Sequence, residues 1–118
     1  MENETNKPLP QNVEVEKALL CCIMMDEDYQ EKLKEISIRA EYFYFKAHKF
    51  IFEAVEKLQT AGNNVDILTL PNQLSKMGKI HEAGGVAYLT EIYNTVSTSA
   101  NILHYAEIVE NPELKFIT

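Results

Sequence analysis

Three histidines and two adjacent cysteines are the side chains whose types are best suited to catalysis or metal binding. His48, His81 and His104 lie far apart, and no two have the spacing that is common between zinc ligands. Cys21 and Cys22 are neighbours, which strains a disulfide, and no second cysteine pair is present to complete a zinc site. We therefore predict that the cysteines are small core residues. His48 is predicted to be a packed, hydrogen-bonded core histidine.

Closely spaced carboxylates are the other candidates for acid–base chemistry. Glu14 lies two residues from Glu16, and Asp26 lies two residues from Asp28. On amphipathic helices such carboxylates normally face solvent, so neither pair predicts a catalytic site. The sequence has no Gly-x-x-x-x-Gly-Lys-Ser/Thr phosphate loop, and the glycine pair at 84–85 is typical of a turn or a helix start. We expect no enzymatic activity and no cofactor in this chain.

Composition narrows the class of protein further. The chain has 118 residues, 46% of them apolar, which is enough for the core of one domain. Its formal net charge is −7, whereas binding to a phosphate backbone needs a basic face; Lys46 and Lys49 could form a small local patch. No apolar run is long enough to cross a membrane, and the acidic, polar start differs from a signal peptide. We expect a cytoplasmic protein without direct membrane contact.

The densest block of large apolar side chains runs from Phe43 to Leu58. Within it, Ile51, Val55 and Leu58 recur at helical spacing and form one stripe. A helix apolar over so much of its circumference packs against neighbours on more than one side, so we predict that it is the central helix. Gly62 is predicted to cap its carboxyl end, because glycine adopts the left-handed conformation without a side-chain penalty.

Shorter periodic stretches predict the remaining helices. They are one at about 13–25 capped by Asn12, a short one carrying Tyr29, Leu33 and Ile36, one capped by Thr69, one opening at 84–85, and one capped by Ser99. Asp66 is a competing cap for the third of these, although it would place Pro71 deeper in the helix. The buried residues expected on the last two helices are Val86, Leu89, Ile92 and Tyr93, then Ile102, Tyr105, Ala106, Ile108 and Val109.

Proline positions set the expected domain boundaries. Pro8 and Pro10 oppose an early helix, so residues 1–11 are predicted to be a flexible N-terminal arm. Residues 12–110 are predicted to be the helical domain. Asn111 precedes Pro112, which disfavours further helix, so residues 111–118 are predicted to start a linker or a truncated helix. The predicted fold class is all-α, a compact bundle of about six short helices.

Five short motifs carry a resemblance to a known family. They are Pro10-Gln11-Asn12-Val13-Glu14-Val15-Glu16; Phe43-Tyr44 with His48 and Ile51-Phe52-Glu53-Ala54; Asp66-Ile67-Leu68-Thr69-Leu70; Gly84-Gly85 with Tyr88-Leu89; and Ala100-Asn101 with Tyr105-Ala106 and Ile108-Val109. Each motif alone is weak, but together, in this order and over about residues 10–110, they are specific. The chain resembles the N-terminal domain of bacterial replicative DNA helicases of the DnaB type. It departs from the family's pattern at Cys21, Cys22 and Ala40, and in the tail from 111 to 118.

The resemblance implies a non-catalytic collar domain of a hexameric ring that docks primase, with a helicase loader as a further partner. ATP, magnesium and DNA would be bound by a separate C-terminal domain that is absent here. Because the helical hairpin of the family is also missing, we expect the chain to be part of a longer protein and to be a monomer or weak oligomer. Docking would use Tyr88, with Glu14 and Glu16 as a charged rim. Core packing is the alternative for Tyr88 and the favoured interpretation for Phe43 and Tyr44.

Three rival interpretations remain open. The first is the helicase-interacting helical domain of a primase, which resembles the same fold and would differ in what precedes and follows it. The second is an enzyme that uses His48 with nearby acids. The third is a nucleic-acid-binding module, which the net charge of −7 opposes.

Overall fold

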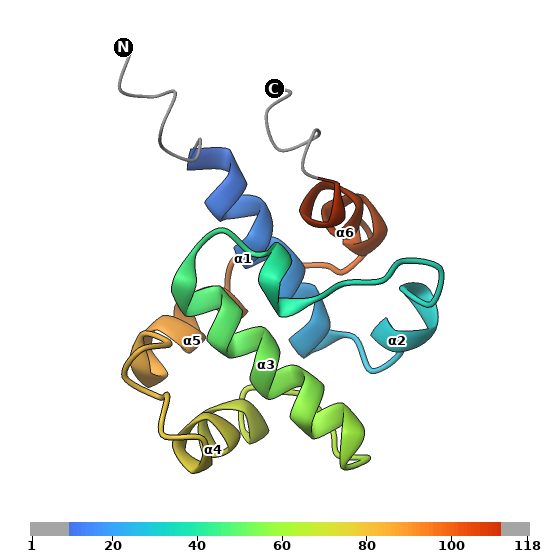
Figure 1. The fold of residues 1–118 in the computed structure, drawn as a ribbon. Helices are drawn as coiled ribbons and strands as arrows, with labels where there is room; N and C mark the ends of the chain where they lie inside the picture. Colours follow the sequence, from blue (N-terminus) through green and yellow to red (C-terminus); the bar gives the residue numbers. More distant parts are fainter. Residues whose placement is uncertain (1–9, 112–118) are drawn as a thin grey trace.

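Six α-helices and one short 3-10 helix form the part of the chain that the structure, a computed structural model, describes, residues 10–111 (Figure 1). In chain order they are α1 (Pro10–Met25), α2 (Tyr29–Lys32), η2 (Ala40–Tyr42), α3 (Lys46–Thr60), α4 (Thr69–Lys76), α5 (Gly85–Tyr93) and α6 (Ile102–Glu110). No strand occurs within this range. The predicted all-α bundle of short helices is confirmed.

Helix α1 is the centre of the fold. From Leu19 to Ile23, no residue is more than 1% exposed. Such a helix needs neighbours around its whole circumference, and α1 packs against α3, α5 and α6 (Figure 1). The prediction that the block at 43–58 is central is therefore wrong. Helix α3 buries one stripe, which includes Ile51 and Val55, and leaves Glu53 exposed.

The adjacent cysteines lie on this central helix and are free thiols, as predicted. The Cys21 thiol donates to the backbone oxygen of Tyr93 at 3.2 Å, and the Cys22 thiol donates to that of Thr98 at 3.9 Å. Burial raises the pKa of Cys22 to about 11, so this thiol stays protonated at neutral pH. Both cysteines act as small core residues that hold the segment between α5 and α6 against α1.

Helix α1 begins earlier than expected. It starts at Pro10, because proline is tolerated in the first helical turn, where its missing N–H would have no intrahelical partner. Asn12 is therefore buried inside the helix and is not the N-cap. The remaining residues of the predicted arm, 1–9, and of the predicted tail, 112–118, lie outside the described residues.

Thr69 and Asp66 were competing predictions for the residue that caps the start of α4. Asp66 accepts hydrogen bonds from the N–H groups of Leu68 and Thr69 at 2.9 and 2.8 Å, while the Thr69 hydroxyl accepts the Asp66 N–H at 2.9 Å. This reciprocal pair makes Asp66, and not Thr69, the capping residue.

Gly62 closes α3 as predicted: its φ is 75°, and the next residue, Asn63, donates to the carbonyl of Leu58 at 2.9 Å.

The last two helices bury fewer residues than their apolar pattern predicted. On α5, Leu89 and Ile92 are buried, but Val86 is 57% exposed and Tyr93 lies at the surface. On α6, the buried residues are Ile102, Ala106 and Val109, while Tyr105 and Ile108 are half-buried. Ser99 is not a cap; its hydroxyl donates to the Asp26 carboxylate at 2.8 Å and ties the loop before α6 to the end of α1.

Candidate functional site

A buried polar network joins three helices. Glu16 projects from α1, His48 from α3 and Tyr88 from α5. The Glu16 carboxylate lies 2.7 Å from His48 Nδ1, and the Tyr88 hydroxyl lies 2.7 Å from His48 Nε2. Glu16 is 1% exposed and His48 is fully buried. The prediction of a hydrogen-bonded core histidine is confirmed.

One tautomer of His48 satisfies all three groups of the network. An ionised carboxylate only accepts, so the Nδ1 of His48 carries the proton that faces Glu16. In the tautomer with its proton on Nδ1, His48 accepts the phenol proton of Tyr88 at Nε2. Burial, followed by nearby acids, raises the pKa of Tyr88 to about 12, which keeps the phenol protonated and able to donate. Every ring nitrogen and oxygen of the network therefore has a partner.

The same Glu16 carboxylate also binds the backbone just ahead of α3. It accepts the N–H of Tyr44 at 2.6 Å and the N–H of Phe45 at 3.3 Å. The expectation that Glu16 forms a charged rim is wrong in this fold, because the side chain points inward. Residues two apart on a helix face different directions, and Glu14, by contrast, has a side chain that is 62% exposed.

Aromatic rings pack around the histidine. The rings of His48 and Tyr88 lie nearly parallel, with centroids 5.8 Å apart, and Phe45 meets His48 edge-on at 4.9 Å. Phe43, 1% exposed, closes the inner side, so its predicted core position is confirmed. Gly84 lies directly against Tyr88, because a Cβ there would come within 2.7 Å of the Tyr88 side chain.

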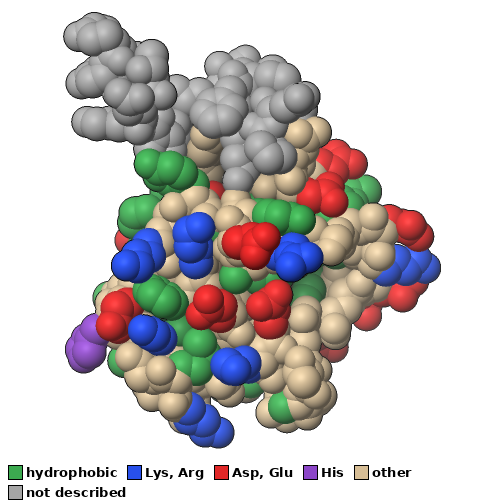
Figure 2. Space-filling model, in the orientation of Figure 1, with side chains coloured by type: hydrophobic (Ala, Val, Ile, Leu, Met, Phe, Trp, Pro, Cys, Tyr) green, Lys and Arg blue, Asp and Glu red, His purple; other side chains and the backbone are tan. Residues whose placement is uncertain are grey.

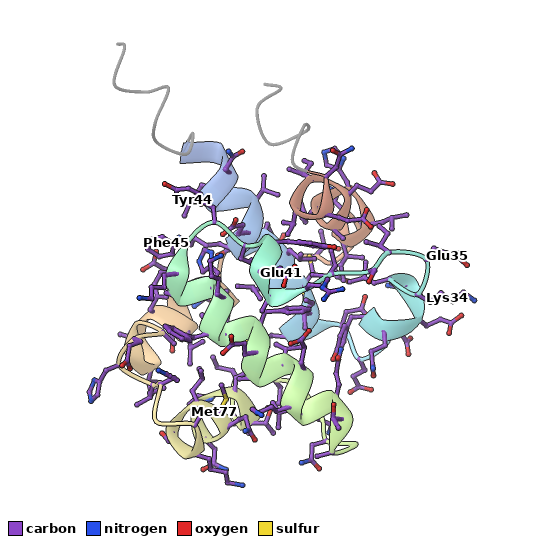
Figure 3. The ribbon with its side chains drawn as sticks, in the orientation of Figure 1. Lys34, Glu35, Glu41, Tyr44, Phe45 and Met77 are labelled. Atoms are coloured by element: carbon purple, nitrogen blue, oxygen red, sulfur yellow. The ribbon has the colours of Figure 1, made fainter. Side chains whose placement is uncertain are left out.

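Two rings at the start of α3 reach the surface. Tyr44 is 52% exposed and Phe45 is 40% exposed, and Figure 3 shows both at the beginning of α3, beside α1. The half-buried Tyr88 ring adjoins them, 6.3 Å from Phe45 between centroids. We call Tyr44, Phe45 and Tyr88 the aromatic face. The core prediction for Tyr44 is wrong, because the chain bends at Tyr44 and Phe45 and both rings reach the surface beyond the buried Phe43.

A charged rim borders the aromatic face. The Lys17 ammonium lies 5.9 Å from the Tyr88 ring centroid, donates to Glu91 at 2.7 Å and pairs with Glu14 at 3.7 Å. The hydrogen bond to Glu91 is the main reason that the pKa of Lys17 lies above its usual value. Glu14 is exposed and pairs with Lys17, and Glu91 lies on the other side of the same ammonium.

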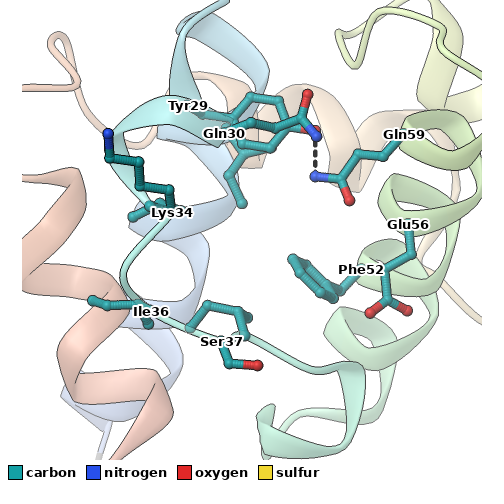
Figure 4. A pocket seen from close by; sticks show the side chains of 11 residues that line it. Tyr29, Gln30, Lys34, Ile36, Ser37, Phe52, Glu56 and Gln59 are labelled. Carbon is teal, nitrogen blue, oxygen red and sulfur yellow. Dashed lines mark hydrogen bonds between the residues drawn. The ribbon is translucent and has the colours of Figure 1, made fainter.

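A separate small cavity opens between α2, the segment after it and α3 (Figure 4). Its volume is about 260 Å³, and its apolar lining includes Ile23, Leu33 and Phe52. At one wall the Gln59 amide donates to the Tyr29 hydroxyl at 2.7 Å. Glu56, half-buried on α3, also lines this cavity.

Metal binding, catalysis by histidine and nucleic-acid binding find little support among the described residues. Between residues 10 and 111, no three His, Cys, Asp or Glu side chains come together to hold a metal ion. His48 is bonded through both nitrogens and fully buried, so it offers no atom to a substrate. Basic and acidic side chains alternate over the face shown in Figure 2, where no basic field forms. None of the described helices is long and apolar enough to cross a membrane.

Comparison with known proteins places the chain among helicase domains. Residues 8–111 match the family model described as the DnaB-like helicase N terminal domain. The chain is 37% identical over 105 residues to the replicative DNA helicase DnaC of Bacillus subtilis, and 39% identical over 101 residues to the replicative DNA helicase DnaB of Geobacillus stearothermophilus. These alignments cover 89% and 86% of this chain, but only 23% and 22% of the relatives.

A solved structure agrees in fold. The crystal structure of the N-terminal domain of DnaB helicase from Mycobacterium tuberculosis matches with a TM-score of 0.78 and 29% sequence identity. The match covers 87% of this chain and 69% of that structure. Sequence and fold comparisons therefore lead to one family.

Proposed function

The chain belongs to the family of DnaB-like helicase N-terminal domains, and we propose that it is the non-catalytic N-terminal domain of a hexameric replicative helicase. In this role it contributes to the collar of the ring and docks primase, with a helicase loader as a further partner. ATP, magnesium and DNA are left to the rest of the parent protein. The family match over residues 8–111 is the observation that carries the proposal.

The relatives favour this proposal over the primase interpretation. Both relatives described above are named replicative DNA helicases, and the matched structure is named as the N-terminal domain of such an enzyme. The buried His48 likewise argues against an enzyme built on that residue.

The aromatic face is the docking surface in this proposal. Binding energy at protein interfaces concentrates in a few aromatic anchors, usually surrounded by polar groups. Tyr44 and Phe45 present such rings, and the paired charges of Lys17 and Glu91 lie at the edge. Primase would therefore contact Tyr44 and Phe45 directly, the exposed edge of Tyr88 next, and Glu14 at the rim.

Calorimetry of this chain with the C-terminal domain of its organism's primase tests the proposal. Tyr44→Ala removes only an exposed ring, so it should weaken binding by about tenfold or more without changing the fold. Leu68→Ala is the matched control, because Leu68 is an exposed apolar residue, 80% exposed, that lies at the start of α4. Absence of binding by the unsubstituted chain, or equal affinity for both variants, would reject the proposed docking surface.

Self-association can be measured in the same samples. We propose that the chain alone is a monomer or a weak oligomer, and light scattering gives its mass directly. A stable hexamer formed by residues 1–118 would contradict this part of the proposal.

A further inference from the structure

The Glu16 carboxylate reaches every segment that carries the aromatic face. It lies on α1, bonds the backbone of Tyr44 and Phe45 directly, and reaches Tyr88 through His48. We propose that Glu16 is a positioning residue for partner docking, which holds the aromatic face in the conformation that the partner binds. This inference rests on the docking function proposed above, but it concerns a buried group that touches no partner.

The first support is the backbone at the exposed rings. Phe45 has an extended conformation, with φ −78° and ψ 124°, just before α3 begins. No hydrogen bond from the N–H of Tyr44 or Phe45 to a backbone carbonyl occurs among the described residues; both N–H groups donate to Glu16. Tyr44 and Phe45 carry the two most exposed rings of the aromatic face. The buried Glu16 carboxylate therefore holds the backbone of both residues.

The second support is the chain of hydrogen bonds from Glu16 through His48 to Tyr88. The Tyr88 hydroxyl donates to His48, whose other nitrogen donates to Glu16, so the third ring is fixed by the same carboxylate. Tyr88 also packs closely beside Gly84, where an added Cβ would come within 2.7 Å of its side chain. One carboxylate thus sets the mutual arrangement of rings that come from segments 28 or more residues away in the sequence.

Glu16→Gln tests the idea with little change in shape. Glutamine has one acceptor oxygen and one donor nitrogen, while the site presents two backbone N–H groups and His48 Nδ1. The imidazole can change tautomer and accept the new amide proton. The two backbone donors cannot adapt, so whichever faces the amide nitrogen loses its acceptor. The substitution therefore loosens the Tyr44–Phe45 backbone in particular.

Two measurements on the full 118-residue chain separate positioning from general stability. Amide hydrogen exchange, followed by NMR, should show protection at Tyr44 or Phe45 falling by about tenfold or more in Glu16→Gln, with core amides of α1 changed less. Calorimetry against the primase C-terminal domain, well below the melting temperature, should show affinity falling by about tenfold.

Two variants serve as controls. Glu53→Gln makes the same charge change at an exposed residue of α3, and it should bind like the unsubstituted chain. Val109→Ala lowers stability from the buried side of α6 without touching the network, and it should bind equally well while folded.

The outcomes divide cleanly. A folded Glu16→Gln variant that keeps full affinity, while Tyr44→Ala weakens binding, overturns the positioning role and leaves the docking proposal standing. If Tyr44→Ala has no effect, the docking proposal fails. The positioning role, which rests on docking at the aromatic face, fails with it. If Glu16→Gln does not fold, Glu16→Asp decides, because it keeps the charge but shortens the reach to the backbone donors: a severalfold loss of affinity supports the role, and unchanged affinity overturns it.

Discussion

Two glutamates near α3 differ in how their charge is accommodated. Glu16 approaches the start of the helix from α1, is 1% exposed, and accepts three N–H donors. Glu56 lies in α3 itself at the wall of the cavity, half-buried (Figure 4), with no hydrogen bond or ion pair among the described residues. A charge can be buried where backbone and imidazole donors converge on it, whereas a charge without donors must keep its access to water.

This difference separates a fixed region from an adaptable one. Around Glu16, removing any one group leaves a donor or an acceptor of the network without its partner, so the geometry has few alternatives. Around Glu56, the half-buried carboxylate keeps access to solvent, and no hydrogen bond fixes it among the described residues. The aromatic face belongs to the fixed region, and the cavity belongs to the adaptable one.

Glu16→Ala should produce the largest effect. It leaves the N–H groups of Tyr44 and Phe45 and the Nδ1 of His48 without acceptors, so unfolding should become easier by about 3–5 kcal/mol. Urea unfolding followed by circular dichroism measures this loss. Glu56→Ala is the control, for which we expect a change within about 0.5 kcal/mol. Equal losses in the two variants would refute the distinction between the glutamates.

Gly84→Ala should cause the second largest loss of stability, because it disturbs the position of Tyr88 in the hydrogen-bond network. Gly84 has φ 101°, and an added Cβ would meet the Tyr88 side chain at 2.7 Å. Strain and displacement of the ring together should cost about 2–3 kcal/mol. Gly62→Ala provides the comparison, since Gly62 has φ 75° but open space around its Cβ position, and about 1 kcal/mol is expected. Thermal melts of both variants check the ranking; similar losses would mean that the Tyr88 contact contributes little.

The sequence predicted the helices well, because apolar spacing is a local property. The stripe of Ile51, Val55 and Leu58 and the glycine that ends α3 follow from it directly. The central position of α1 could not be predicted in this way, because burial around a whole helix depends on which helices pack against it. The short side chains of Cys21 and Cys22 indicated close packing, but they could not identify the neighbours.

The candidate site was harder to predict for the same reason. His48 was correctly expected to be bonded, but its partners Glu16 and Tyr88 lie 32 and 40 residues away in the chain. Residues two apart on a helix face different directions, yet both Glu14 and Glu16 were predicted to lie at the charged rim. Only the fold showed that Glu16 points inward, and only the fold placed Tyr44 at the surface.

Asp26→Asn should have a smaller effect that depends on pH. Hydrogen bonds from Lys32, then from Ser99 and the backbone of Asp28, hold the pKa of Asp26 below its usual value. A lowered folded-state pKa stabilises the fold above the unfolded-state pKa near 4, and this stabilisation is lost as pH falls through the folded-state pKa. The variant should therefore be less stable by about 1 kcal/mol at pH 7, with the difference shrinking below roughly pH 4. A constant difference across pH would exclude this ionic contribution.

Glu56→Gln should have the smallest effect and the opposite sign. Burial, then the neighbouring charge of Glu53, raises the pKa of Glu56, while Arg39 partly offsets the shift. A raised pKa in a carboxyl group means that its ionised form destabilises the fold above that pKa, and the penalty disappears as pH falls through it. Because solvent screens the site, the variant should gain only about 0.3 kcal/mol at pH 7 and nothing in acid. Glu53→Gln should act in the same direction but more weakly, since it removes only the repulsion. If instead Glu56→Gln lost stability at pH 7, the Glu56 charge would have a favourable partner, and its contrast with Glu16 would no longer hold.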